Sequence, residues 1–271
     1  MKSTRNTGGG AATHSGTSYQ NAVSAKFAVD ILAEKNIPAP WDLPQGLTFE
    51  FLRCETTQPT DDILIGTSED GHVFIQAKHT LNLGTRSDSD LATTLDQFVK
   101  QFLQKANPTA NSPWETRTFN IEKDRLVITT SSRSSSSITQ ELPQILEVIR
   151  GLTSGQNVDA AAETATTQNV LSVIKSHVIN SWKKISGGQS PDDRMLKDFF
   201  SSMYVEILDV DPGGRDERAA MTLLNTAILE NSSQSGTAWK ILKDNCAKNA
   251  TIRSGSRRDT FQKLLENDGI V

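Results

Sequence analysis

The sequence of 271 residues has no long hydrophobic run, few aromatic residues and only two cysteines. A membrane-spanning helix needs about 20 consecutive apolar residues, and no such stretch occurs. Residues 1–18 are small and polar and lack the apolar segment of a secretory signal. Cys54 and Cys246 lie far apart and outside any CxxC spacing, which argues against a disulfide scaffold and a zinc site. A reducing cytoplasm is therefore the expected location, with no membrane partner.

A basic excess is also missing. The chain has 32 acidic and 28 Lys or Arg residues, a formal net charge of −4. A nucleic-acid-binding domain often carries an excess of positive charge, but local basic patches can occur in an acidic chain. With 36% hydrophobic and 22% charged residues, the composition is that of a globular protein, long enough for one large domain or two ordinary ones.

Hydrophobic periodicity predicts an α/β core. Helices are expected over about residues 17–36, 89–106 and 138–152, where apolar residues recur at helical spacing. Strands are expected near residues 47–54, 61–67, 72–80 and 124–131. The order helix, three strands, helix, strand, helix predicts a mixed sheet flanked by helices.

The pattern changes near Gly155. Residues 155–168 are small and polar, which suits a linker or a loose helix start. Only helical patterns follow, including one over residues 193–208, and no strand is predicted beyond Val210. The expected domains are a flexible amino terminus of residues 1–16, an α/β domain of residues 17–155 and a helical connector or accessory domain of residues 156–271.

Charged and amide side chains interrupt the apolar hairpin of residues 61–80. Gln76 and Lys78 are two residues apart on one strand, so they emerge on the same face. Asp62 opens the neighbouring antiparallel strand, and the connecting turn is short. If the register allows it, a carboxylate, an amide and an ammonium therefore meet at one edge of the sheet.

This set of side chains suits metal-assisted hydrolysis of a phosphodiester. Magnesium, or manganese in its place, takes oxygen ligands from carboxylates, carbonyls, water and phosphate. Asp62 would anchor the metal, Gln76 would offer its amide oxygen, and the backbone carbonyl of Ala77 could add another ligand. Lys78 would position the attacking water and offset charge on the phosphate.

The segments "PTDDILI" and "FIQAKHT" resemble the PD-(D/E)XK, or restriction-endonuclease-like, superfamily, and its Mrr-like branch and antiphage effector nuclease domains in particular. The segment "GTSYQNAVSAKF" is similar to the first helix of that family, which adds Gln20 to the site. The resemblance implies an αβββαβ core and a magnesium-dependent endonuclease that cuts double-stranded DNA with little sequence specificity. It also implies a role in antiphage defence, a dimer or tetramer, and a downstream sensor or ATPase module.

Two departures from that family stand out. Glutamine at positions 20 and 76 leaves Asp62 as the preferred anionic ligand, with Asp61 or Glu55 as additional candidates. Fewer charges predict weaker metal binding unless substrate phosphate completes the coordination shell. Two other functions remain open: a non-catalytic nucleic-acid-binding or scaffold module, and an RNase or single-strand nuclease with the same residues. The structural alternative is the polar face of an exposed hairpin.

Further basic and polar residues are candidates for nucleic-acid contact. They are Arg133, Lys100, Lys123 and Arg125, with a second basic cluster at Lys248, Arg253, Arg257, Arg258 and Lys263. A dispersed solvated surface and charge around a helix start are the alternative interpretations. His79 points to the face opposite Lys78 and is expected to be structural, and a serine nucleophile is not expected because GxSxG is missing.

Overall fold

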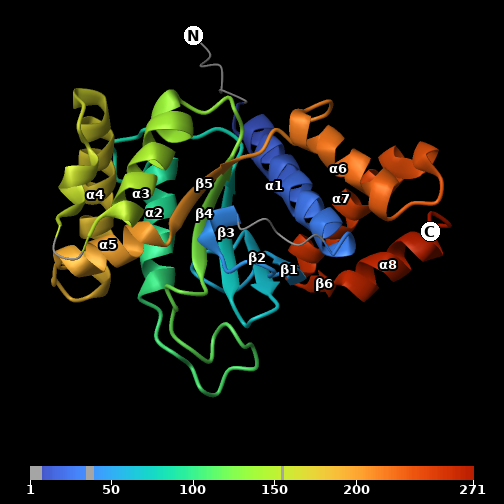
Figure 1. Ribbon diagram of the computed structural model, residues 1–271, viewed down its shortest axis with the longest axis horizontal. Helices are drawn as coiled ribbons and strands as arrows, with labels where there is room; N and C mark the ends of the chain where they lie inside the picture. The colour runs from blue at the N-terminus through green and yellow to red at the C-terminus, as the bar shows by residue number, and fades with distance from the viewer. Residues whose placement is uncertain (1–7, 35–39, 154–155) are drawn as a thin grey trace, which may run out of the picture.

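The computed structural model describes residues 8–34, 40–153 and 156–271. A six-stranded mixed sheet with the order β5-β4-β3-β2-β1-β6 lies at its centre (Figure 1). The strands are β1 (Phe49–Cys54), β2 (Ile63–Thr67), β3 (His72–Lys78), β4 (Arg125–Thr130), β5 (Met203–Ile207) and β6 (Gly255–Arg257). β1, β2 and β3 form an antiparallel meander, β4 and β5 continue parallel to β3, and β6 pairs antiparallel with β1.

Helices cover both faces of the sheet (Figure 1). One layer contains α1 (Gly8–Leu32), α6 (Arg215–Ala227), α7 (Ser235–Ile252) and α8 (Arg258–Asn267). The other contains α2 (Asp90–Phe102), α3 (Leu142–Gly151), α4 (Ala165–Ile185) and α5 (Asp193–Ser201). Shorter helical turns span Pro40–Asp42, Ser137–Glu141, Val158–Ala161 and Ser232–Gln234.

The strands contribute alternate residues to two separate cores. Ile63 and Ile65 pack toward α1, whereas Leu64 between them packs toward α2. Because both faces are covered, β2 and β4 are buried along their whole length, which explains their continuous apolar runs. α2 is amphipathic, and its apolar side packs on the sheet. Ser89 caps the start of α2, because its side chain accepts a hydrogen bond from the backbone N–H of Ala92.

The predicted order of the core elements is confirmed, but the prediction of an all-α carboxy-terminal region is wrong. β5 and β6 both come from that region and form the two edges of the central sheet. β5 was missed because Leu196, Phe200 and Tyr204 continue a helical spacing from α5 into the strand. β6 has three residues, Gly255–Arg257, and no apolar pattern; its backbone pairing with β1 defines it.

Two further expectations concern the ends of the predicted domains. The first helix begins at Gly8, so residues 8–16 are helical rather than a loop, and residues 1–7 lie outside the described part of the chain. The boundary expected near Gly155 does not divide the sheet, because segments on both sides of it supply strands. Among the described helices, none is long and apolar enough to cross a membrane.

Candidate ligand-binding site

The hairpin side chains meet at the end of the sheet where β2 begins and β3 ends. Asp62 directly precedes β2, and the pairing of Ile63 with Ile75 brings it opposite Gln76. Asp62 Oδ2 accepts hydrogen bonds from Gln76 Nε2 at 2.5 Å and from the backbone N–H of Ala77 at 2.8 Å. The predicted proximity of these groups is therefore present in the structure.

Gln20 reaches the same place from α1. Its Nε2 donates to Glu55 Oε1 at 2.8 Å and to the backbone carbonyl of Asp62 at 3.2 Å. Asp61 points elsewhere: its Oδ1 accepts a hydrogen bond from Gln97 Nε2 on α2 at 3.1 Å. Gln20 thus holds the backbone of Asp62 by a hydrogen bond. Asp61 contacts α2 instead, so the two neighbouring aspartates point in different directions.

The carboxyl group of Asp62 is held in an environment that favours its neutral form. Burial raises its pKa to about 7, against the opposing effects of the Ala77 N–H and the positive charge of Lys78. Burial also raises the pKa of Asp61. Gln76 is 2% exposed and its Oε1 has no hydrogen-bond partner among the described residues. A buried acceptor of this kind costs about 1–3 kcal/mol, which a bound water, cation or donor would recover.

A pocket of about 600 Å³ opens beside these groups. It is lined by residues of α1, by Asp62 before β2, by residues at and just after the end of β3, and by the first residue of α2; they include Ser15, Gln20, Asp62, Lys78, Thr80 and Asp90. Lys78 is partly exposed and forms no ion pair within 4 Å in the part of the chain that the structure describes. Its ammonium is therefore available to an anionic ligand.

His79 forms a wall of the pocket and connects three segments. Its Nε2 lies 2.9 Å from Asp211 Oδ2, its Nδ1 lies 3.0 Å from Ser15 Oγ, and its ring packs on Tyr19 at a centroid distance of 5.0 Å. Arg133 pairs with the same Asp211 carboxylate at 3.3 Å. Sequence reasoning missed Ser15 and Asp211, because contacts across 64 and 132 residues leave no local pattern.

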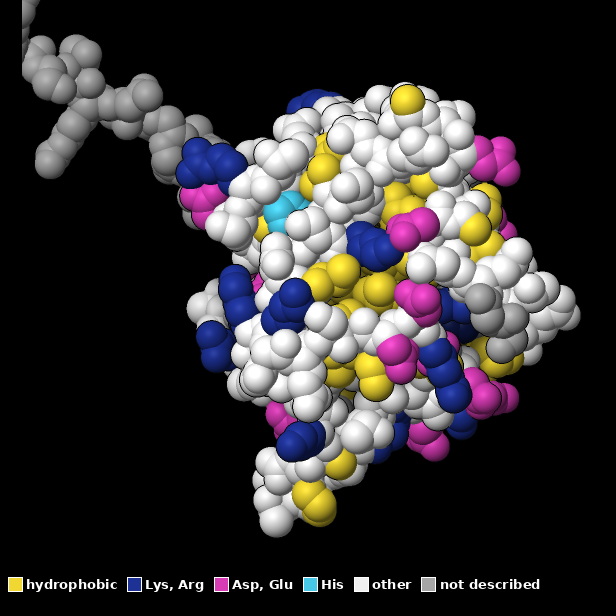
Figure 2. Space-filling view, turned by 90° about the vertical axis from the view of Figure 1, so that its left-hand side faces the viewer, with side chains coloured by type: hydrophobic (Ala, Val, Ile, Leu, Met, Phe, Trp, Pro, Cys, Tyr) yellow, Lys and Arg dark blue, Asp and Glu magenta, His cyan; other side chains and the backbone are white. Residues whose placement is uncertain are grey.

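The other predicted nucleic-acid contacts are not gathered at this pocket. Arg125 is 6% exposed, and its guanidinium donates to backbone carbonyls, including those of Trp41 and Asp42, so its prediction as a surface contact is wrong. Lys123 donates to the carbonyl of Glu69, and Lys100 pairs with Asp96 on α2. On the face toward α4 and α5, positive and negative side chains are interspersed around a strip of hydrophobic ones (Figure 2).

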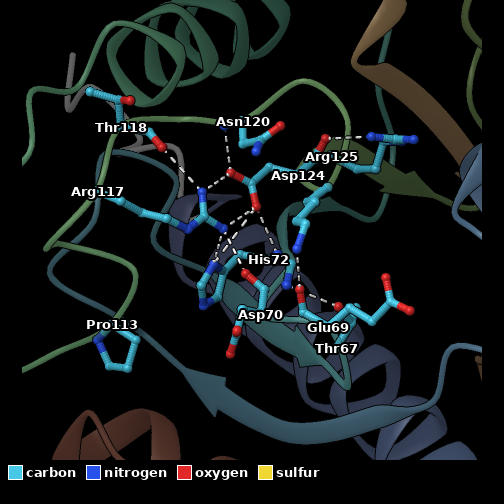
Figure 3. Close-up of polar contacts among 12 residues, drawn as sticks. Thr67, Glu69, Asp70, His72, Pro113, Arg117, Thr118, Asn120, Asp124 and Arg125 are labelled. Atoms are coloured by element: carbon cyan, nitrogen blue, oxygen red, sulfur yellow. Dashed lines mark hydrogen bonds and ion pairs between the residues drawn. The ribbon is translucent and has the colours of Figure 1, made fainter.

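A second polar cluster lies at the opposite end of β3 (Figure 3). Asp124 accepts hydrogen bonds from both terminal nitrogens of Arg117, at 2.5 and 2.6 Å, and from the backbone N–H of His72 at 2.8 Å. Arg117 also donates to the backbone carbonyl of Asp70 at 2.8 Å. This cluster fastens the segment before β4 to the turn of the β2–β3 hairpin.

The predicted magnesium ligands form an incomplete set. Within residues 8–34, 40–153 and 156–271, no group of three or more His, Cys, Asp or Glu side chains could hold a metal ion. Asp62, the unpartnered Gln76 Oε1 and the Ala77 carbonyl supply one carboxylate and two neutral oxygens. Such a set fits magnesium only where water and ligand phosphate provide the remaining oxygens.

Comparison with known proteins gives structural matches only. No protein-family model matches the chain, and no curated protein matches its sequence. Two solved structures of the Acinetobacter baumannii Cap4 SAVED/CARF-domain containing receptor match with a TM-score of 0.50. One contains the cyclic trinucleotide 3′3′3′-cAAA; its sequence is 13% identical, and the match covers 93% of this chain and 45% of the receptor chain. The other contains 2′3′3′-cAAA; its sequence is 14% identical, and the match covers 93% of this chain and 46% of the receptor chain.

These matches correct the sequence-based assignment. The matched structures are SAVED/CARF-domain receptors with bound cyclic trinucleotides, and neither is named as a restriction-endonuclease-like nuclease. The predicted membership of the PD-(D/E)XK nucleases, and with it the magnesium-dependent DNA endonuclease activity on double-stranded DNA, is therefore withdrawn, and the matches show a likeness of fold. The chain spans less than half the length of the receptors that it matches.

Proposed function

We propose that this chain is part of a receptor and that the pocket beside Asp62 and Lys78 binds a phosphodiester-linked nucleotide. The ligand class is that of the cyclic trinucleotides in the matched receptors. The observation that carries the proposal is the Lys78 ammonium, which forms no ion pair with a described residue, in a pocket of about 600 Å³ at the end of the sheet. A cation next to hydroxyl groups such as that of Thr80 suits phosphate oxygens.

The acidic side chain in this pocket needs a specific explanation, because a carboxylate repels a phosphate. With a pKa of about 7, Asp62 is neutral in a large fraction of molecules near neutral pH and then exerts no repulsion. Magnesium shared between Asp62 and the ligand phosphate would have the same effect at higher pH. The proposal therefore includes binding that strengthens as the pH falls through 7, or as magnesium is added above that pH.

Calorimetric titration with 3′3′3′-cAAA and 2′3′3′-cAAA tests the proposal, with a linear tri-adenylate as the comparison. Lys78→Ala should weaken binding at least tenfold, because it removes the cation that pairs with phosphate. Lys123→Ala is the matched control, since Lys123 lies at the other end of β3, where it donates to the backbone carbonyl of Glu69. Equal affinity of Lys78→Ala and the unmodified chain would contradict the proposal.

The fate of the ligand distinguishes a receptor from an enzyme. Cyclic trinucleotide recovered from the complex after prolonged incubation with magnesium should be intact by chromatography. Recovery of a linear or shortened product would overturn the assignment as a receptor. Several other expectations stay predictions: a dimer or tetramer, a further sensor or ATPase module, a role in antiphage defence and the cytoplasmic location. The likeness of the αβββαβ core to restriction-endonuclease-like folds stays a prediction about topology alone, separate from the withdrawn nuclease membership.

A further inference from the structure

A second groove, of about 340 Å³, lies along β1 and β6 and shares no lining residue with the pocket at Asp62. Phe51 and Trp114 form its aromatic floor, and Arg53 and Arg257 flank them. Phe51 and Arg53 of the groove pair with Gly66 and Leu64 of β2, whereas Asp62 precedes that strand and lines the other pocket with residues of α1. The groove is therefore an independent feature of the molecule.

Two glycines shape the groove. The ring of Phe51 lies directly against Gly66, where an added Cβ would approach its Cε1 to 1.9 Å. Gly255 on β6 is equally constrained, because a Cβ there would lie 2.4 Å from the carbonyl oxygen of Leu52. The aromatic ring and the edge strand thus occupy positions that only glycine permits.

Trp114 is held in place by contacts of its ring and by contacts of the residues that follow it in the sequence. Its ring lies 5.7 Å from that of Phe51 and 6.2 Å from that of His72. The next residue, Glu115, accepts a hydrogen bond from Gln58 Nε2 at 3.0 Å, and Arg117 is fixed by Asp124 (Figure 3). A rigid aromatic surface that is already positioned loses little entropy when a ligand stacks on it.

Arg53 and Arg257 place two positive charges beside the aromatic rings, and acidic side chains neutralise these charges only weakly. The Arg53 guanidinium lies 5.1 Å from the Trp114 ring centre, and that of Arg257 lies 5.7 Å from the Phe51 ring centre. Arg53 Nε is buried and has no hydrogen-bond partner among the described residues. Glu50 approaches Arg257 only to 3.9 Å, and both side chains are exposed.

We propose that this groove binds a nucleobase that carries a phosphate, with the base on Trp114 and the phosphate at Arg53 and Arg257. Aromatic rings bordered by arginine suit this ligand, since the base stacks on the ring and the guanidinium pairs with phosphate oxygens. The source is either a free nucleotide or a nucleotide of a single strand. The proposal is independent of the function proposed for the Asp62 pocket.

Tryptophan fluorescence measures binding at this groove selectively. Of the four tryptophans, Trp41, Trp182 and Trp239 are 6%, 4% and 4% exposed, whereas Trp114 is only partly buried. AMP should quench the emission saturably, and ribose 5-phosphate, which lacks a base, should bind at least tenfold more weakly. Tighter binding of an oligo-adenylate of eight nucleotides than of AMP, and not of an abasic strand, would assign the source to a single strand.

Variants decide whether the groove is responsible. Trp114→Phe should abolish the quenching and retain binding of AMP within a few fold in calorimetry, while Arg257→Ala should weaken binding about tenfold. Arg194→Ala, which removes an exposed arginine on α5, is the control and should have no effect. The proposal is overturned if no nucleotide quenches saturably, if ribose 5-phosphate or poly-glutamate binds as well as AMP, or if Arg257→Ala binds normally.

Discussion

Two aspartates lie at opposite ends of β3, and their surroundings shift their pKa values in opposite directions. Asp124 is almost fully buried, which by itself would raise its pKa. Hydrogen bonds from Arg117, His72 and the Asn120 backbone outweigh burial, and the pKa of Asp124 is lowered. Its negative charge is therefore stable inside the fold.

Asp62 is partly buried at the edge of the pocket, and among the described residues it has no cation in contact. Its Oδ2 receives two neutral N–H groups, and Lys78 acts on it only from beyond ion-pair distance, so burial dominates and the pKa rises to about 7. The charges around Asp124 pair with one another, whereas in the described part of the chain the Lys78 ammonium has no ion-pair partner and the Gln76 Oε1 has no hydrogen-bond donor. The first stabilises the fold and the second has the properties of a binding site.

The largest effect is expected from Asp124→Asn. The substitution leaves Arg117 without its counter-charge, and breaking a buried ion pair in this way costs about 3–5 kcal/mol. Urea unfolding at pH 7 measures the loss. Asp88→Asn is the control, because the exposed Arg86–Asp88 pair should contribute less than about 1 kcal/mol. If the two variants lose similar amounts of stability, the cluster in Figure 3 does not stabilise the fold as argued.

Asp62→Asn should act in the opposite direction. The folded state binds a proton at Asp62 more tightly than the unfolded state, so this group lowers stability as the pH rises from about 4 to about 7. Asparagine keeps an acceptor for Gln76 and Ala77 but carries no charge. We expect the variant to be about 2 kcal/mol more stable at pH 8 and nearly equal to the unmodified chain at pH 4.

Unfolding curves of both proteins between pH 4 and pH 8 measure this difference. In the same curves Asp124→Asn should be less stable than the unmodified chain by a nearly constant amount, because the contribution of Asp124 is complete above its ordinary pKa of 3.8 and is lost only below this range, as the pH falls through its lowered pKa. A constant difference between Asp62→Asn and the unmodified chain across this pH range would show that Asp62 is charged throughout.

The sequence predicts the Asp62 cluster because local rules determine it. The period of a strand places Gln76 and Lys78 on one face, and a short turn limits where Asp62 can lie. The order of the core elements follows from periodicity in the same way. Contacts between distant segments leave no such signal: Asp211, which fixes His79, and the three residues of β6 are positioned by tertiary pairing alone.

The functional assignment failed for a different reason. The residues of the hairpin and Gln20 are few, and a carboxylate, two amides and a lysine suit phosphate chemistry of more than one kind. The same groups can bind a phosphodiester and leave it intact. Arg125 illustrates a related limit, because a basic residue at the start of a buried strand can be used to cap backbone carbonyls rather than to face solvent.

Gln76→Glu tests how far the Asp62 cluster depends on a cation. The new carboxylate would lie where Gln76 Nε2 now contacts Asp62 Oδ2 at 2.5 Å, so two acids would compete for one proton. We expect a loss of about 1–2 kcal/mol at pH 8 in EDTA, recovered when magnesium is added. Thermal unfolding with and without magnesium measures it, and Gln189→Glu on the exposed surface is the control. A loss that magnesium does not recover would contradict a cation site.

The smallest effect is expected from Arg117→Lys, which keeps the positive charge beside Asp124 and removes the planar two-pronged contact. Lysine cannot reach both carboxylate oxygens and the Asp70 carbonyl at once, so we expect a loss of about 1 kcal/mol and a melting temperature about 2–4 °C lower. The emission of Trp114 should shift to longer wavelength, because its segment is less firmly held. Cyclic-trinucleotide binding at the Asp62 pocket should not change, and if it weakens, the two ends of β3 are coupled rather than separate.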